Sequence, residues 1–262
     1  MTETAPPART TDQDARTTGQ DAGTAAPPVR TAGQDARTAA QDAGTAGQDA
    51  RTAAQDAFTA AWRALAPAPR RSLELAHRAL RAGGLAVGSV LTDADGTIVA
   101  EGRNRAYDPE AEGAELLRGT PLAHAEMNAL ARARTEWDLS AHTLWSTQEP
   151  CSMCAAAAEF TGVGTVRFLA ADPWATATGR PSASARARLT AEPVWRTAAT
   201  VLFLRSVVEA AGTGADTVRG MAGIDPVTTA IATDDRFPDA ATPELLLGAL
   251  WGSVTEAAER LA

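Results

Sequence analysis

The sequence has no lysine, only two cysteines and only two asparagines, Asn104 and Asn128. It has no apolar run long enough to cross a membrane and no signature of a secretory leader, so we expect a cytoplasmic protein without membrane contact. Phosphate contacts need Lys and Arg, so the missing lysine and the formal net charge of -8 disfavour a polynucleotide substrate. A local basic patch formed by the arginines from Arg180 to Arg188 remains an alternative.

Both cysteines stand in one Cys-x-x-Cys step, Cys151 to Cys154, directly after Pro150. Placing the only two thiols together indicates a joint use. Zinc binds thiolates and imidazole, and a catalytic zinc site has three protein ligands with a fourth position open for water. His124 completes that count. Pro150 and the alanines after Cys154 predict that the cysteines lie in the first turn of a helix, which stabilises a thiolate.

Glu126 follows His124 by two residues, and Pro121 indicates a second helix start just before them. Near a helix start, Glu126 can point at the open metal position without being a ligand. A carboxylate there can accept a proton from water and pass it to a leaving amine, so one residue serves as base and then as acid.

Two other uses of the cysteine pair have to be weighed. A redox pair would leave the His124-Ala-Glu126 segment unexplained, and a structural zinc site needs a fourth protein ligand. The remaining histidines, His77 and His142, stand on an expected helix face and at an expected strand start. We therefore predict one catalytic Zn²⁺ per chain, with structural zinc and redox chemistry as the alternatives.

The pattern His-x-Glu followed by Pro-Cys-x-x-Cys is typical of zinc-dependent base deaminases. With Glu149-Pro-Cys-Ser-Met-Cys154, the chain resembles the cytidine and deoxycytidylate deaminase superfamily, in the branch of guanine, cytosine and tRNA adenosine deaminases. The resemblance covers roughly Ser72 to Gly212. It implies an α/β, three-layer cytidine-deaminase-like fold with a mixed central sheet flanked by helices, and a homodimer.

The resemblance also implies substrate contacts. Asn104 matches a family asparagine that hydrogen-bonds the substrate, although an asparagine in a turn is the alternative. The peptide N–H of Ala125 and the backbone around Glu149 and Pro150 would touch the base. Further along the chain, Asp172 and Trp174 stand where related enzymes place specificity residues.

Asp172 could accept a hydrogen bond from an exocyclic amine, and Trp174 could stack on a ring. A turn with a core tryptophan explains the same residues equally well. We therefore expect hydrolytic deamination of a small nucleobase or nucleoside, with release of ammonia. A wobble tRNA adenosine deaminase and an inactive zinc-stabilised binding module remain the alternatives.

The first 57 residues form a low-complexity tail in which threonine recurs every seven positions from Thr10 to Thr59. Alanine fits the seam of a coiled coil but buries little area, and several glycines oppose a stable helix. We expect disorder or a transient helix here, with an alanine coil as the alternative.

Residues 58–212 are expected to form the deaminase domain, and residues 213–262 a linker and a small helical extension. We expect helices at 70–82, near His124, from Cys151 to about Gly162, at 199–211 and at 243–261. Strands are expected at 85–92, 97–101, 143–146, 165–170 and 194–196. The stretch from Gly212 to Ala241 is expected to be a linker or long loop.

Overall fold

The computed structural model describes residues 32–109, 117–179 and 187–261. By its contacts the chain divides into two units, residues 1–46 and 47–262, and the sheet and the site lie in the second. No helix in the described ranges is long and apolar enough to span a membrane.

A mixed sheet of five strands forms the centre of the second unit, in the order β2-β1-β3-β4-β5. β1 pairs antiparallel with both β2 and β3, whereas β3, β4 and β5 run parallel. The strands are β1 (Gly88–Thr92), β2 (Ile98–Arg103), β3 (Thr143–Gln148), β4 (Thr165–Ala170) and β5 (Ala187–Leu189). The expected mixed α/β sheet is confirmed, and the short β5 is the one strand of it that the sequence analysis missed.

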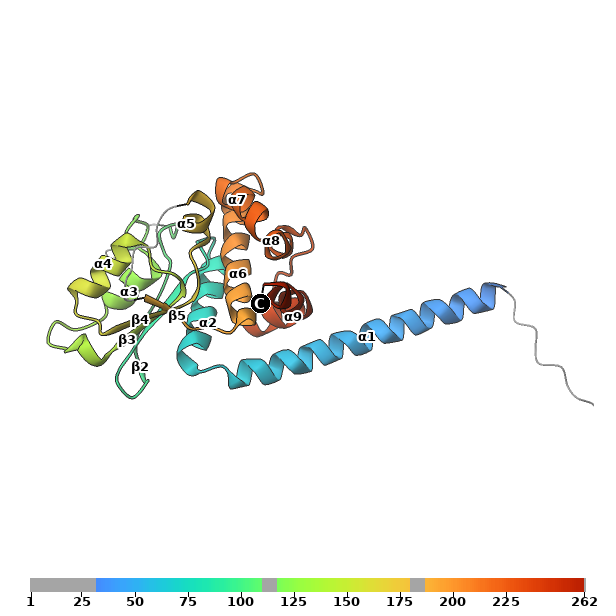
Figure 1. Ribbon diagram of the computed structural model, residues 1–262, viewed down its shortest axis with the longest axis horizontal. Coiled ribbons are helices and arrows are strands. Elements are labelled where there is room, and N and C mark those ends of the chain that lie inside the picture. Colours follow the sequence, from blue (N-terminus) through green and yellow to red (C-terminus); the bar gives the residue numbers. More distant parts are fainter. Residues whose placement is uncertain (1–31, 110–116, 180–186, 262) are drawn as a thin grey trace, which may run out of the picture. The chain divides into compact units, whose positions relative to one another are not determined.

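Helices cover both faces of this sheet and make three layers (Figure 1). On β3, Leu144 packs with α3 and α4, while its neighbour Trp145 packs with α2 on the opposite face. Alternate strand residues point to opposite faces, so this one strand contributes to both helical layers. The helices are α2 (Pro67–Arg81), α3 (Ala125–Leu130), α4 (Ser152–Phe160), α5 (Pro173–Thr178), α6 (Pro193–Ala211), α7 (Asp216–Ile224), α8 (Pro226–Thr233) and α9 (Pro243–Arg260).

The described part of the expected tail belongs to helix α1 (Ala32–Ala64), and the expectation of disorder or a transient helix there stays a prediction. At its C-terminal end, Phe58 and Trp62 are buried against Trp195 and Trp251. Once these rings fix one end, alanine-rich residues can extend the helix at little cost, because nucleation is the expensive step. Residues 1–31 of the expected tail lie outside the described residues.

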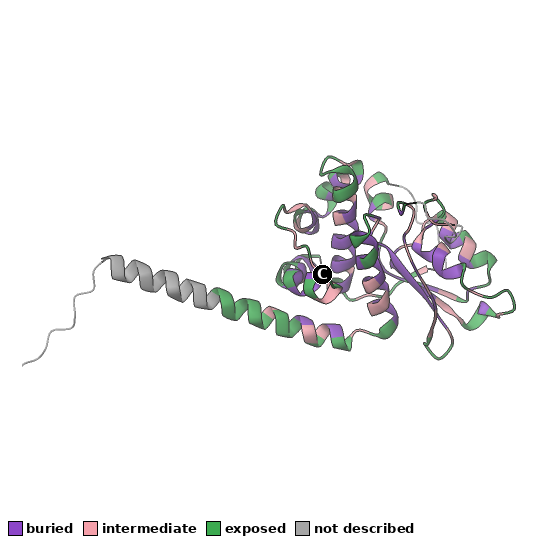
Figure 2. Ribbon diagram, turned by 180° about the vertical axis from the view of Figure 1, so that it is seen from behind, coloured by how far each residue is buried: buried purple, intermediate pink, exposed green. Residues whose placement is uncertain are grey.

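The segment from 194 to 196 is the start of α6, so the strand expected there is wrong. Two apolar residues, Val194 and Trp195, cannot distinguish a strand from a buried helix, and Pro193 occupies the first turn of α6. Figure 2 shows the central strands and α6 mostly in purple, which agrees with the burial of ten α6 side chains.

The stretch from 212 to 241 is likewise not a simple linker, because it contains α7 and α8. The side chain of Asp225 caps α8 by accepting from the N–H of Thr228, and Pro226 begins the helix. These are helix-start signals that the Gly- and Asp-rich composition hid. The expected final helix is confirmed as α9, and Leu246 and Trp251 place it in the core that α2 and α6 share.

Gly102 allows α3 to lie directly on β2. A Cβ at this position would overlap the backbone of Ala125 and Ala129, so a larger residue would push α3 away from the sheet. The close contact fixes the segment that begins with His124 against the strand that leads to Asn104.

Candidate functional site

Two helix N-termini meet at the carboxyl end of β3. His124 is the residue before α3, and Cys151 is the residue before α4. Pro150 separates Cys151 from the end of β3, so strand and helix follow each other through a short turn. The predicted positions of both segments at helix starts are confirmed.

His124, Cys151 and Cys154 form a cluster that could hold a metal ion. Nδ1 of His124 lies 3.6 Å from each sulfur, and the two sulfurs are 3.7 Å apart. Tetrahedral zinc with bonds of about 2.0 Å to nitrogen and about 2.3 Å to sulfur would separate its ligands by about 3.6 Å and about 3.8 Å. The donor set and its spacing therefore fit zinc.

Glu126 lies beside this cluster and is almost fully buried. Its Oε1 accepts a hydrogen bond from Ser146 Oγ at 2.7 Å, and its Oε2 lies 3.5 Å from the sulfur of Cys154. Burial raises the pKa of the Glu126 carboxyl, and the Ser146 hydroxyl partly opposes that rise. A carboxyl group with a raised pKa can both take up and release protons near neutral pH.

The two thiols differ in their surroundings. A hydrogen bond from Cys154 lowers the pKa of Cys151 to about 4, with a smaller contribution from His124, although burial opposes the change. Cys151 is therefore a thiolate at neutral pH, which is the form that binds metals.

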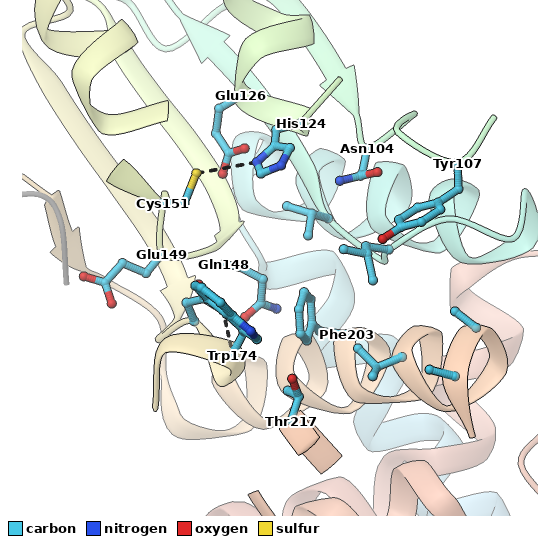
Figure 3. Close-up of a pocket in the computed structure, with 16 residues that line it drawn as sticks. Asn104, Tyr107, His124, Glu126, Gln148, Glu149, Cys151, Trp174, Phe203 and Thr217 are labelled. Atoms are coloured by element: carbon cyan, nitrogen blue, oxygen red, sulfur yellow. Dashed lines mark hydrogen bonds between the residues drawn. The ribbon is translucent and has the colours of Figure 1, made fainter. Parts of the chain in front are cut away.

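Asn104 follows the end of β2, and its side chain is fixed by the backbone. Its Oδ1 accepts from the N–H of Ala106 at 3.1 Å, so the amide nitrogen is the end left for another partner. Figure 3 shows that nitrogen on the side of His124. Asn128 instead donates to the carbonyls of Arg103 and Ala123 and so ties α3 to the end of β2.

Asp172 and Trp174 combine features of both interpretations that the sequence left open. Asp172 caps α5 by accepting from the N–H of Trp174 at 2.9 Å, which is the turn role. Trp174 is 42% exposed, so it is not a core residue. Burial raises the pKa of the Asp172 carboxyl, and burial and the charge of Asp172 raise that of Glu149.

A cavity of about 440 Å³ opens over the cluster. This volume is typical of small-molecule sites. Seven of the predicted residues line it: Asn104, His124, Glu126, Glu149, Cys151, Asp172 and Trp174. Cys154 is buried behind the surface of the cavity, and Ala125 and Pro150 are also buried and are not among the lining residues.

The remaining lining residues were not anticipated. They are Leu85, Val87, Tyr107, Gln148, Phe203, Val207, Ala210, Ala211 and Thr217. Four of them recur at helical spacing on α6, and this periodicity was the only signal for them in the sequence. A helix that packs into a core has the same periodicity, so the signal could not distinguish a cavity wall from a core. Figure 3 shows Phe203 and Trp174 across the cavity from His124.

Comparison with known proteins identifies the part of the chain that carries the site. The family model for the cytidine and deoxycytidylate deaminase zinc-binding region matches residues 65–170. Over 106 residues, 39% of the chain, it is 36% identical to a tRNA-specific adenosine deaminase of Haemophilus influenzae. Over 118 residues, 44% of the chain, it is 36% identical to a tRNA(Ile)-lysidine synthase of Deinococcus radiodurans.

The chain spans 56% of the first relative and 19% of the second. Among solved structures, a guanine deaminase of Nitrosomonas europaea is similar at 26% identity and a TM-score of 0.42, over 54% of this chain and 85% of that one. Residues 65–170, which contain His124, Glu126, Cys151 and Cys154, thus match the zinc-binding region of the cytidine and deoxycytidylate deaminases.

Proposed function

We propose that the protein is a zinc-dependent hydrolytic deaminase that converts an amino-substituted nucleobase or nucleoside to the corresponding oxo compound and ammonia. The observation that carries the proposal is the arrangement of His124, Cys151 and Cys154 at zinc-ligand spacing beside the buried Glu126. His124, Cys151 and Glu126 also line one cavity, so the proton carrier and two of the three ligands face the same bound molecule.

In this proposal His124, Cys151 and Cys154 would hold the metal, which their spacing supports. When bound there, zinc lowers the pKa of a water molecule and so supplies a nucleophile at neutral pH. Glu126 would accept one proton of the attacking water on a carboxylate oxygen and donate it to a ring nitrogen as the water oxygen bonds to the amine-bearing carbon. It would then carry the remaining proton of that hydroxyl to the amine, so that the oxygen becomes the carbonyl. One water is consumed, the carbon–nitrogen bond breaks, and ammonia leaves.

Other residues of the cavity orient the ring. The free amide nitrogen of Asn104 donates to an oxygen or nitrogen acceptor on the substrate. Trp174 and Phe203 offer aromatic faces against which a heterocycle can pack. Glu126, Glu149 and Asp172 make the lining acidic, which disfavours a phosphate group and supports a base or nucleoside over a nucleotide.

The second candidate is deamination of adenosine in tRNA, which the identity to a tRNA-specific adenosine deaminase favours. The acidic lining and the net charge of -8 weigh against it. It predicts inosine in a tRNA transcript and binding that weakens strongly with salt. A homodimer stays an expectation of the family resemblance, and a cytoplasmic location stays an expectation of the sequence.

Ammonia release by the zinc-loaded full chain tests the proposal, with free purines and pyrimidines, their nucleosides and pterin-like amines as substrates. We expect Glu126→Gln to keep the zinc and to lower turnover by about 10²- to 10⁴-fold. The matched control is Glu159→Gln, which changes an exposed carboxylate on α4 and should leave turnover unchanged. A Glu126→Gln enzyme as fast as wild type would refute the mechanism, and zinc without ammonia from any compound would favour a binding module.

A further inference from the structure

Gln148, the last residue of β3, contains a polar atom that the fold leaves without a partner. The side chain is 3% exposed, and its Nε2 donates to the carbonyl of Ala199 on α6 at 2.9 Å. Its Oε1 is buried and accepts no hydrogen bond from the described residues. Buried polar atoms are nearly always paired, so an orphaned amide oxygen requires an explanation.

The bond to Ala199 decides which end of the amide is available. Since Nε2 needs an acceptor and the Ala199 carbonyl supplies one, turning the amide over would place two acceptors against each other. The oxygen is therefore the fixed, unsatisfied end. The Gln148 Oε1 atom can therefore accept a hydrogen bond from a donor outside the protein.

Gln148 lines the same cavity as His124, Glu126 and Cys151. Figure 3 shows it on the side of Trp174 and Phe203, where a ring would pack. The other described atoms in the same condition belong to Arg118, His142, Arg196 and Thr228, none of which lines this cavity. A donor for Gln148 can thus come from a molecule bound in the site.

We propose that Gln148 is a substrate-recognition residue whose Oε1 accepts a hydrogen bond from a ring N–H of the bound molecule. The proposal rests on the proposed function for its view of this cavity as the active site. The amide nitrogen of Asn104 lies on the His124 side of the cavity and Gln148 on the side of Trp174 and Phe203, so the two side chains would contact different parts of a bound ring (Figure 3). Free guanine and free cytosine each have a ring N–H that methylation can remove.

Equilibrium binding to the zinc-loaded full chain tests the assignment, in a Glu126→Gln background that suppresses turnover. The ligand pairs are guanine with 1-methylguanine, and cytosine with 1-methylcytosine, because methylation removes one ring N–H and leaves the carbonyl in place. We expect the unaltered Gln148 to favour the first member of at least one pair by about tenfold or more. Equal affinities in both pairs would overturn the proposal without any change at position 148.

Two substitutions at position 148 separate recognition from structure. Gln148→Met removes both the donor and the acceptor, whereas Gln148→Glu keeps an acceptor, and both lose the bond to Ala199. We expect the preference to fall about tenfold in Gln148→Met and to persist in Gln148→Glu. An undiminished preference in Gln148→Met would overturn the proposal. Because binding is measured without turnover, failure of ammonia release would refute the proposed function and leave this result standing.

Discussion

The two sides of the cavity differ in the polarity of the side chains that line them. The metal side is polar and tightly hydrogen-bonded, with Glu126 held by Ser146 and the cluster atoms 3.6 to 3.7 Å apart. The opposite side is an apolar face of α6, from Phe203 to Ala211, together with Thr217 of α7. The family match ends at residue 170, so it contains the first side and none of the second.

This difference separates reaction from selection. The proposed reaction needs an imidazole, two thiolates and a carboxylate at fixed distances, and these groups lie in two short segments of the chain. Selection of a ring needs a shape, which apolar side chains of many kinds can provide. The chemistry can therefore be inferred from the shared segment, whereas the choice of substrate depends on helices outside it.

The strongest test of the metal side is removal of one ligand. Cys154→Ser should abolish stoichiometric zinc and reduce ammonia release to background, because a three-ligand site cannot lose a thiolate and keep its affinity. Metal analysis of the purified protein and ammonia release are the measurements. Ser152→Ala, an exposed change in the same turn of α4, is the matched control and should retain zinc. Full zinc occupancy and normal turnover in Cys154→Ser would mean that the cluster is not the metal site.

The sequence predicted the metal side well because its features are local. His124 follows Pro121 by three residues, Cys151 directly follows Pro150, and both precede a helix. The Cys-x-x-Cys step places two thiols within one helical turn. The same local logic gave β4 with its correct ends and most of α2. Asn104 was found from a family pattern, and its use of Oδ1 to hold the turn became visible only in three dimensions.

The opposite side could not be predicted, because the helical spacing of its apolar residues is typical both of a core and of a cavity wall. Phe203 and Val207 at helical spacing indicate a buried helix face, and nothing in the spacing tells core from cavity. Gln148 stood within the Gln148-Glu-Pro-Cys segment, but its significance depends on Ala199, 51 residues away. The Asp225 cap of α8 was hidden in a stretch whose composition suggested a loop, and α7 begins there without a side-chain cap.

A bulky residue on the α6 side tests whether this face selects by shape. Ala210 is exposed at the rim of the cavity, and Ala210→Trp should narrow the opening. We expect the KM of nucleosides to rise roughly tenfold and that of free bases to rise less, with zinc content unchanged. Steady-state kinetics on matched base and nucleoside pairs provide the measurement.

Glu209→Trp is the control for that change, because Glu209 directly precedes Ala210 on α6 and does not line this cavity. It gives up only a surface ion pair with Arg205, which contributes little. Equal kinetic effects of the two tryptophans would show that α6 acts through folding and not through the shape of the site.

The smallest effect on turnover, with a clear effect on stability, is expected for Asp108→Asn near the metal side. Asp108 is buried between Arg103 and Arg105, and Arg103 also donates to the carbonyl of Asn104. Burial raises the pKa of Asp108, but the arginines outweigh it and hold that pKa below its usual value. The ion pair therefore stabilises the fold above the unfolded-state pKa of about 3.9 and loses its effect as the pH falls through the lower folded-state value.

We expect Asp108→Asn to lower the free energy of unfolding at pH 7 by about 2 kcal/mol, and the difference from wild type to shrink below about pH 4. Urea unfolding across that pH range is the measurement. Asp239→Asn, which breaks the exposed pair with Arg81, should change stability by less than about 1 kcal/mol. If the two variants lost the same stability, buried polar contacts would not distinguish the metal side, and its rigidity would have to come from the apolar core that it shares with α6.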